Sequence, residues 1–186
     1  MRLPKPLVDI LARRLVQSLE EAGFLSSEHP ERTREKVARL VEEDLLVEDA
    51  LTEEARLLLV QHHAAVKDSD VEMHRLLARM KGELAARRGY LLSVGPERLS
   101  RAKVLDLVRQ IVSLFLKDPD VEYFAPEEKL REAVQRAFER EMARDELRRR
   151  KAREKVLKIR RGIPEGSPEF EALFQQFYRE NLEREG

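Results

Sequence analysis

Leucine, valine and isoleucine recur at helical spacing along most of the chain, and this pattern predicts an all-α protein. In the first segment, about residues 5–22, Val8, Leu11 and Leu15 fall on one side of a helix. Gly23 follows the segment and is expected to end the helix, because glycine readily adopts the left-handed conformation found just after helices.

Three further helices are expected in the first half of the chain. A second helix begins near Ser27 or Pro30. Thr52, followed by two glutamates, has the character of an N-cap and predicts the start of a third helix. The capping-box pattern at 69–72 predicts a fourth, which ends at Gly89.

The helical pattern of the first half returns in the second. Residues 37–55 correspond to residues 134–152, and one insertion of a single residue carries the correspondence across nearly the whole chain. Helical heptads can produce accidental matches, but this constant register favours a true duplication. We therefore expect two tandem, quasi-repeated helical units packed together, residues 1–92 and 98–186, joined by a linker at 93–97 where helical periodicity is lost.

The second half differs from the first in its long helix. An uninterrupted run of helix-forming residues at 127–161 predicts one helix of roughly 30 to 35 residues, about 50 Å long, or two helices joined by a slight bend. This long helix is expected to extend beyond the core. A loop at 162–166 follows, and Ser167 then caps a last helix. The apolar face of that helix is aromatic: Phe170, Phe174, Phe177 and Tyr178.

Composition narrows the classes of function. The chain has 186 residues, 39% of them charged. Its 36 basic and 36 acidic residues give a net charge of zero, so the chain as a whole does not attract nucleic acid or an anionic membrane. It has no cysteine, which excludes disulfides, thiolate nucleophiles and zinc-thiolate sites. No signal-peptide core and no apolar run of about 20 residues is present, so we expect a soluble, cytoplasmic protein with no membrane partner.

Charge is distributed unevenly between the two related stretches. Residues 42–54 contain seven acids and no base, whereas residues 144–161 contain ten bases and three acids. These stretches supply the candidate interaction residues. They are the acids Glu43, Asp44, Glu48, Asp49, Glu53 and Glu54, and the bases Arg148, Arg149, Arg150, Lys151, Lys155, Lys158, Arg160 and Arg161.

Three interpretations of these charges remain open. The basic run can bind phosphates of RNA or DNA, although it contains no aromatic or amide side chain to stack on bases or read their edges. The acidic and basic stretches can attract one another, within one chain or across a dimer. Alternatively, both are solvated helix surfaces whose ion pairs contribute only a few tenths of a kcal/mol each, roughly the value for exposed helical pairs.

Asp44 and its counterpart Glu141 fall on the apolar side of their helices. Each carboxylate is expected at the edge of the apolar stripe or paired with a base inside, with Arg13, Arg14 and Arg109 as candidate partners. The edge position is favoured. Asp44→Leu would destabilise the fold strongly only in the paired arrangement.

The sequence offers no catalytic, cofactor or metal site. The adjacent His62 and His63 point about 100° apart on a helix and cannot share a metal ion as an i,i+4 pair can. Carboxylates are abundant, but no pattern places a nucleophile beside a base. We therefore expect a protein that is not an enzyme, has no cofactor and binds no small-molecule substrate that can be identified.

Short motifs in the first half resemble the bacterial family called domain of unknown function 507. They are the opening residues 1–3 with a helix ending near Gly23, the acidic stretch 43–54, and the sequence Arg-Arg-Gly-Tyr at 87–90. The resemblance implies a bacterial cytoplasmic protein and supplies no catalytic residue. The favoured function is a non-enzymatic protein-interaction or scaffold module, and the alternative is an RNA-, DNA- or ribosome-associated factor that binds phosphates through the basic helix at 144–161.

Overall fold

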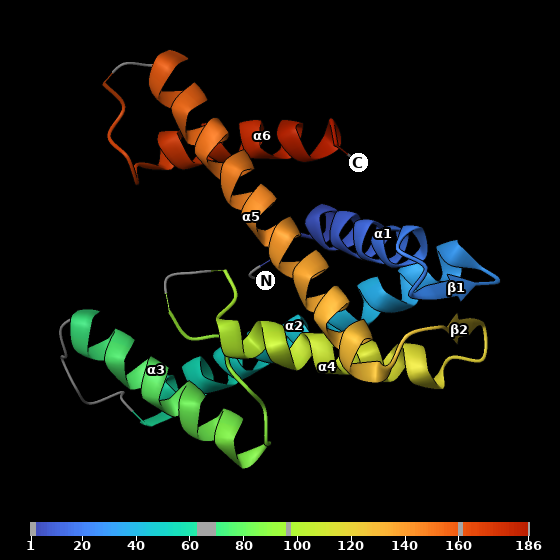
Figure 1. Cartoon of the computed structure of the whole chain (residues 1–186). Coiled ribbons are helices and arrows are strands. Elements are labelled where there is room, and N and C mark those ends of the chain that lie inside the picture. Colours follow the sequence, from blue (N-terminus) through green and yellow to red (C-terminus); the bar gives the residue numbers. More distant parts are fainter. Residues whose placement is uncertain (1–2, 63–69, 96–97, 160–161, 186) are drawn as a thin grey trace.

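The fold is almost entirely helical, as predicted (Figure 1). The computed structural model describes residues 3–62, 70–95, 98–159 and 162–185. Along the chain the elements are α1 (Lys5–Glu21), β1 (Leu25–Ser27), α2 (Pro30–His62), α3 (Asp70–Arg87), α4 (Arg101–Lys117), β2 (Val121–Tyr123), α5 (Glu127–Ile159) and α6 (Pro168–Glu183).

The two halves of the chain contain the same elements in the same order. Each begins with a helix of 17 residues, continues through a strand of three residues into a helix of 33 residues, and ends with a shorter helix. The order agrees with the correspondence seen in the sequence. Duplication of one ancestral unit, and the division at 93–97, stay predictions.

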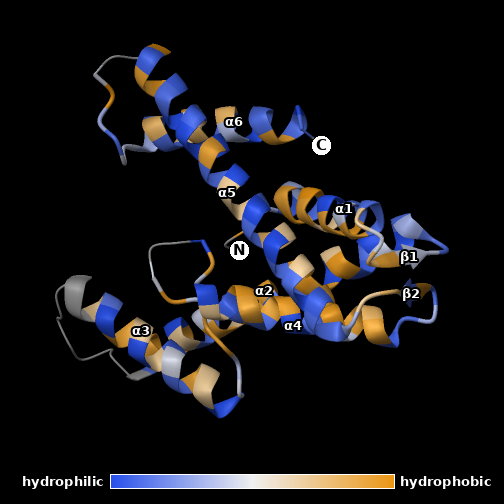
Figure 2. Ribbon diagram, in the orientation of Figure 1, coloured by the Kyte–Doolittle hydropathy of each residue, from blue (hydrophilic) through white to orange (hydrophobic). Residues whose placement is uncertain are grey.

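The helices α1 and α4 form the centre of the molecule. Each contacts both long helices, α2 and α5. Figure 2 shows that α1 and α4 are rich in apolar residues, whereas α5 is largely hydrophilic. One apolar cluster includes buried side chains from both halves, such as Leu11 of α1, Val41 of α2, Leu107 of α4 and Phe138 of α5. The halves therefore share a core.

A short antiparallel pair of strands ties the halves together, and the sequence analysis did not anticipate it. Leu25 pairs with Tyr123, Ser26 with Glu122, and Ser27 with Val121. Three residues are too few for the alternating pattern that identifies a strand in a sequence. Ser26 and Glu122 occupy corresponding positions of the two halves, 96 residues apart, so the strand pair is centred on equivalent residues.

The expected break at Thr52 is wrong. Helix α2 runs without interruption from Pro30 to His62, and Thr52 lies within it. The Thr52 hydroxyl donates a hydrogen bond of 2.8 Å to the carbonyl oxygen of Glu48, one turn earlier, instead of accepting one from the next turn. A threonine followed by two glutamates is compatible with a helix interior when the hydroxyl bonds back in this way.

Other predicted helix ends agree with the structure. Helix α1 ends at Glu21 and is followed by Gly23 with φ +67°. The Ser167 hydroxyl accepts a hydrogen bond of 3.2 Å from the Phe170 amide and caps α6. The long basic helix is confirmed as α5, which ends at Ile159, whereas 160–161 lie outside the described residues.

Candidate functional site

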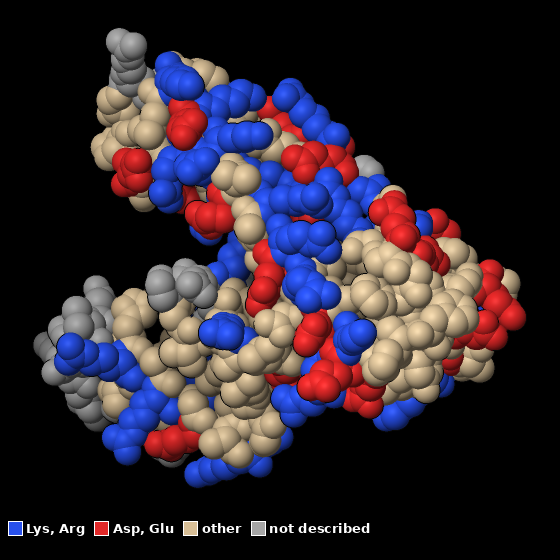
Figure 3. Space-filling model, in the orientation of Figure 1, with Lys and Arg blue, Asp and Glu red and all other residues tan. Residues whose placement is uncertain are grey.

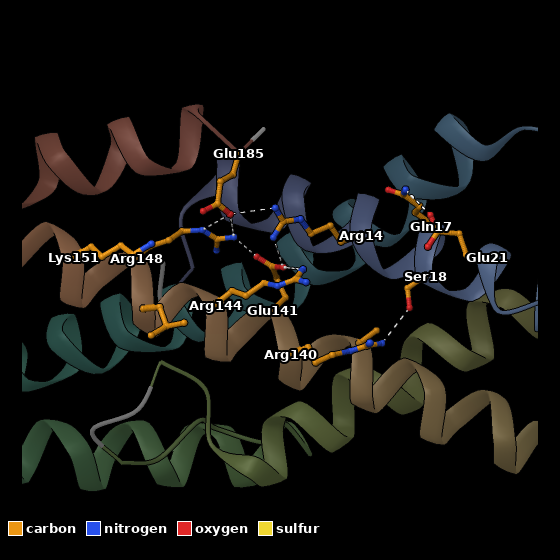
Figure 4. A pocket seen from close by; sticks show the side chains of 12 residues that line it. Arg14, Gln17, Ser18, Glu21, Arg140, Glu141, Arg144, Arg148, Lys151 and Glu185 are labelled. Carbon is orange, nitrogen blue, oxygen red and sulfur yellow. Dashed lines mark hydrogen bonds and ion pairs between the residues drawn. The ribbon is translucent and has the colours of Figure 1, made fainter.

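A polar cleft of about 600 Å³ lies between α1 and α5, beside the end of α6 (Figure 4). Helix α1 supplies one wall and α5 the other. Basic side chains outnumber acidic ones, five to three: Arg14, Arg140, Arg144, Arg148 and Lys151 against Glu21, Glu141 and Glu185. The cleft therefore has a net positive lining.

The floor of the cleft is an ion-pair network around Glu141. This carboxylate is 2% exposed and accepts hydrogen bonds from Arg14 at 2.9 Å and Arg148 at 2.6 Å. The favoured expectation of an edge position for Glu141 is therefore wrong, and its pairing with Arg14 was the stated alternative. A buried carboxylate is stable here because two guanidinium groups replace the lost hydration.

Glu185, beyond the end of α6, closes the network. Its carboxylate accepts hydrogen bonds from Arg148 at 2.7 Å and Arg14 at 3.1 Å. The hydrogen bond from Arg148 is the main reason that the pKa of Glu185 is lowered from its ordinary value. The charges of Arg14 and Arg148 are thus already balanced by carboxylates of the same chain. An anionic ligand would therefore bind to other cations of the cleft.

The cations at the rim of the cleft are different. Within the part of the chain that the structure describes, neither Arg140 nor Lys151 forms an ion pair, and Arg144 reaches Glu141 only at 3.4 Å. Arg140 instead donates to the Ser18 hydroxyl at 3.2 Å. Leu147 stands among these cations and is 45% exposed. The rim combines available positive charge with an apolar side chain.

These residues belong to what we call the outer face of α5. Figure 3 shows Lys and Arg side chains gathered over the middle and end of this helix. All members of the face are exposed and lie on the side of the helix turned away from the core. They are Arg140, Ala143, Arg144, Leu147, Arg150, Lys151, Leu157 and Lys158.

A corresponding groove of about 500 Å³ lies between α2 and α4. At its floor Asp44, the counterpart of Glu141, pairs with Lys103 at 2.5 Å and accepts a hydrogen bond of 3.2 Å from Gln110, the counterpart of Arg14. Tyr90 donates to the same carboxylate at 3.2 Å. The favoured edge position is wrong for Asp44 as well, and its basic partner, Lys103, is not one of the arginines proposed from the sequence.

One turn further along each long helix lies a second buried acid. Glu48 of α2 pairs with Lys81 of α3 at 2.9 Å. Asp145, its counterpart on α5, accepts a hydrogen bond from Tyr178 of α6 at 2.5 Å and pairs with Arg98 at 3.0 Å. Burial raises the pKa of Asp145, and burial together with this carboxylate raises the pKa of Tyr178. These acids hold the third helix of each half in place.

The remaining acids predicted as interaction residues are exposed or half-buried, and two of them pair with bases of the first half. Glu53 pairs with Arg56 at 2.5 Å and Glu54 with Arg88 at 2.6 Å. Asp49 is half-buried, and Glu43 is exposed with no ion pair among the described residues. In the described part of the chain, ion pairs join the acids at 42–54 to bases of α1, α2, α3 and α4 and to Arg88 just after α3, and none of these pairs reaches α5.

The predicted basic residues divide into structural and available groups. Arg148 is buried at 3% exposure, Arg149 pairs with Glu146 at 3.1 Å, and Lys155 pairs with Glu180 at 2.9 Å while lying over the Phe177 ring. The available group lies on the outer face of α5. It comprises Arg150, which is 4.0 Å from Glu154, with Lys151 and Lys158; Arg160 and Arg161 lie outside the described residues.

Sequence reasoning missed Lys103, Arg140 and Glu185. Lys103 is fully buried at a position where the first half has Leu7, and a lysine within an otherwise apolar stripe is the signal that could have pointed to a buried acid. Arg140 precedes the densest basic run and was overlooked for that reason. Glu185 lies far from Arg148 in sequence, and only the packing of α6 on α5 brings the two together.

The residues that the structure describes contain neither a cluster suited to a metal ion nor a helix suited to span a membrane. No group of three or more His, Cys, Asp or Glu side chains there is arranged to hold a metal ion, and His63 lies outside the described residues. None of the described helices has both the length and the apolar character needed to cross a bilayer.

Comparisons with known proteins agree with the resemblance seen in the sequence. The whole chain, residues 1–186, matches the model of a family described as protein of unknown function, DUF507. A comparison with curated proteins gave no match.

Proposed function

Given that the chain belongs to the DUF507 family, whose function is unknown, we propose that it is a non-enzymatic interaction module. Its outer face of α5 binds an acidic, amphipathic helical segment of a protein. The cleft between α1 and α5 accommodates the acidic side chains of that segment.

The proposal rests on one observation: Leu147 is exposed among cations that have no ion-pair partner in the described part of the chain. Arg140 and Lys151 flank it on the same side of the helix and have no ion-pair partner in the described part of the chain. An amphipathic helix can place an apolar side chain on Leu147 and carboxylates beside the two cations. A phosphate backbone offers no apolar partner for the leucine.

Nucleic acid is the alternative ligand for the same face. The cations from Arg140 to Lys158 extend over about 27 Å of helix at the usual helical rise, which is long enough to meet several phosphates. However, the outer face of α5 contains no aromatic or amide side chain for stacking on bases or reading them. The protein ligand is therefore favoured.

The duplication of one helical unit and a bacterial, cytoplasmic setting are further parts of this proposal. The same order of elements and the equal lengths of the first helix, strand and long helix support duplication, as do the matched positions of the ion-paired acids Asp44 and Glu141. The two grooves differ at matched positions: one has Glu43 and Val47 where the other has Arg140 and Arg144.

Fluorescence anisotropy tests the proposal. The labelled probes are a synthetic acidic amphipathic helical peptide, a single-stranded RNA and a double-stranded DNA, each titrated with the full chain. We expect the peptide to bind and Arg140→Glu with Lys151→Glu to weaken its binding about tenfold or more, since opposed charges then repel.

The matched control reverses two exposed bases of α4, away from this face, Arg101→Glu and Lys117→Glu, and leaves peptide binding unchanged. Tight binding of RNA or DNA that declines steeply with salt, with no peptide binding, would replace the proposal with the nucleic-acid alternative. No binding of any probe would reject both.

A further inference from the structure

The outer face of α2 carries exposed apolar side chains with nothing packed on them in the described part of the chain. Leu46 is 55% exposed, Leu57 63% and Val60 73%. They lie on one side of the helix, opposite the buried residues Leu45, Leu51, Ala55 and Leu59. An apolar row of this length along one helix is typical of a helix-docking surface.

The row has the spacing of a coiled-coil seam. Positions 39, 43, 46, 50, 53, 57 and 60 alternate in steps of four and three residues, and all are exposed. The corresponding positions of α5, each 97 residues later, are 136, 140, 143, 147, 150, 154 and 157, and they are exposed as well. Both long helices therefore present a seam to solvent, on equivalent faces.

The central charged positions of the two seams are complementary, whereas Arg39 and Arg136 at their starts carry like charge. Glu43 and Glu53 of α2 are ten residues apart, and so are Arg140 and Arg150 of α5. At the helical rise, both pairs are separated by about 15 Å. Whether two such helices lie parallel or antiparallel, each glutamate can therefore meet an arginine.

The apolar positions between the charges are complementary in size. The α2 seam has Leu46 followed by Ala50, and the α5 seam has Ala143 followed by Leu147. Side by side in the parallel register, each leucine faces an alanine, and in the antiparallel register leucine meets leucine and alanine meets alanine. The parallel register therefore matches a large side chain with a small one at both positions between the charged pairs.

The charges of both seams are available for such a contact. Neither Glu43 nor Arg140 has an ion-pair partner within the described residues. Glu53 is paired only with the exposed Arg56, and Arg150 is 4.0 Å from the exposed Glu154. Exposed pairs of this kind are weak and exchange readily.

We propose that the helical segment bound by the outer face of α5 is α2 of a second copy of this chain, joined through Glu43 and Glu53 to Arg140 and Arg150 around the leucine and alanine positions. This inference rests on the proposed function and names the partner for the same face. It identifies the unoccupied row on α2 as the other half of one interface.

The position of the two seams determines how further copies of the chain join the assembly. Helices α2 and α5 both pack on α1 and α4, and each seam lies on the side of its own helix opposite the buried residues. A copy bound through its α2 leaves its own α5 free for the next copy. The contact is therefore heterologous and head-to-tail, and the assembly grows with protein concentration.

Sedimentation velocity over a concentration series tests this inference with the full chain. The wild type is expected to show an average mass that rises with concentration and falls with added salt. The variant Glu43→Arg with Glu53→Arg, and separately Arg140→Glu with Arg150→Glu, are each expected to sediment as monomers. An equimolar mixture of the two variants restores association, because each then offers the charge that the other lacks.

A control with two exposed acids reversed elsewhere, Glu28→Arg and Glu183→Arg, associates like the wild type. The inference is overturned if the wild type stays monomeric throughout the series, or if the mixture of variants fails to associate. Peptide binding separates this outcome from the proposed function. The variant with the α2 charges reversed retains an intact α5 face and is expected to bind the acidic peptide. A wild type that stays monomeric but binds the peptide would therefore reject self-association and leave the proposed function in place.

Discussion

At the residue scale, Asp44 shows how a carboxylate can occupy the apolar side of a helix. Its partner Lys103 is fully buried, and the ammonium group also lies 4.0 Å from the centre of the Tyr90 ring. Removing one member of such a pair leaves the other as an uncompensated buried charge, which is more costly than the pair itself.

Asp44→Leu is therefore expected to lower the free energy of unfolding by about 3 to 5 kcal/mol. Adding Lys103→Leu should recover most of the loss, since no buried charge then remains. Chemical denaturation measures both variants. Glu43→Leu, one residue away and exposed, is the control and should change stability by at most about 0.5 kcal/mol. An equal, small effect of Asp44→Leu would contradict the buried pair.

Glu185 gives a prediction about pH. Its pKa is lowered in the folded chain by the hydrogen bond from Arg148. A lowered carboxyl pKa contributes stability that is complete above the unfolded value near 4.5 and is lost as the pH falls through the folded value. Glu185→Gln should therefore be less stable than the wild type at neutral pH, and the two melting temperatures should converge in acid.

Because the Glu185 side chain is 40% exposed, solvent screening keeps the expected difference at neutral pH to about 1 kcal/mol or less. Thermal melts at a series of pH values provide the measurement. A constant difference between Glu185→Gln and the wild type down to acidic pH would show that the carboxylate acts by packing and not by its charge.

Residue patterns predicted some of these contacts and not others. The position of Asp44 and Glu141 on apolar stripes identified both acids as candidates for burial, and Arg14 was among the partners proposed. Whether a residue on an apolar stripe is buried depends on which other helix packs against it. The sequence pattern of one helix does not contain that information. Lys103 and Glu185 come from other elements, and only the tertiary packing brings them to the acids.

At the element scale, helix periodicity predicted most helices, but local signals misplaced one boundary. Thr52 with two following glutamates satisfies the N-cap pattern, yet the residues before it already form a helix, and propagation of an existing helix is easier than nucleation of a new one. The strands β1 and β2 depend on pairing between the halves, so no local pattern could reveal them.

Thr52→Ala provides a direct check on the uninterrupted α2. A true N-cap would lose about 1 kcal/mol on this substitution, whereas a mid-helix threonine should lose nothing or gain up to about 0.5 kcal/mol because alanine favours the helix. Ser167→Ala, at the cap of α6, is the comparison and should lose about 1 kcal/mol. Equal losses in both variants would place a helix start at Thr52.

At the scale of the whole molecule, the helices α1 and α4 connect the halves. Helix α1 contacts α5, and α4 contacts α2, in addition to the long helix of their own half. A chain with this exchange of contacts should unfold as one unit, because loosening either half exposes apolar surface of the other.

Leu15→Ala in α1 tests this coupling. The side chain is 1% exposed, so its truncation should cost about 2 to 5 kcal/mol. Hydrogen exchange followed by mass spectrometry should show reduced amide protection in α4 and α5 as well as in α1 and α2, and calorimetry should show a single transition. Unchanged protection of the second half would mean that the halves unfold independently.

The separation of charge within a neutral chain affects how the protein behaves on charged media. The 36 basic and 36 acidic residues cancel at pH 7, yet many acids are neutralised by neighbours within the fold while several cations of α5 face solvent. Adsorption depends on the local potential of one side, not on the total. A cation-exchange column should therefore retain this protein near neutral pH, with α5 turned toward the resin, whereas in free electrophoresis it should hardly migrate.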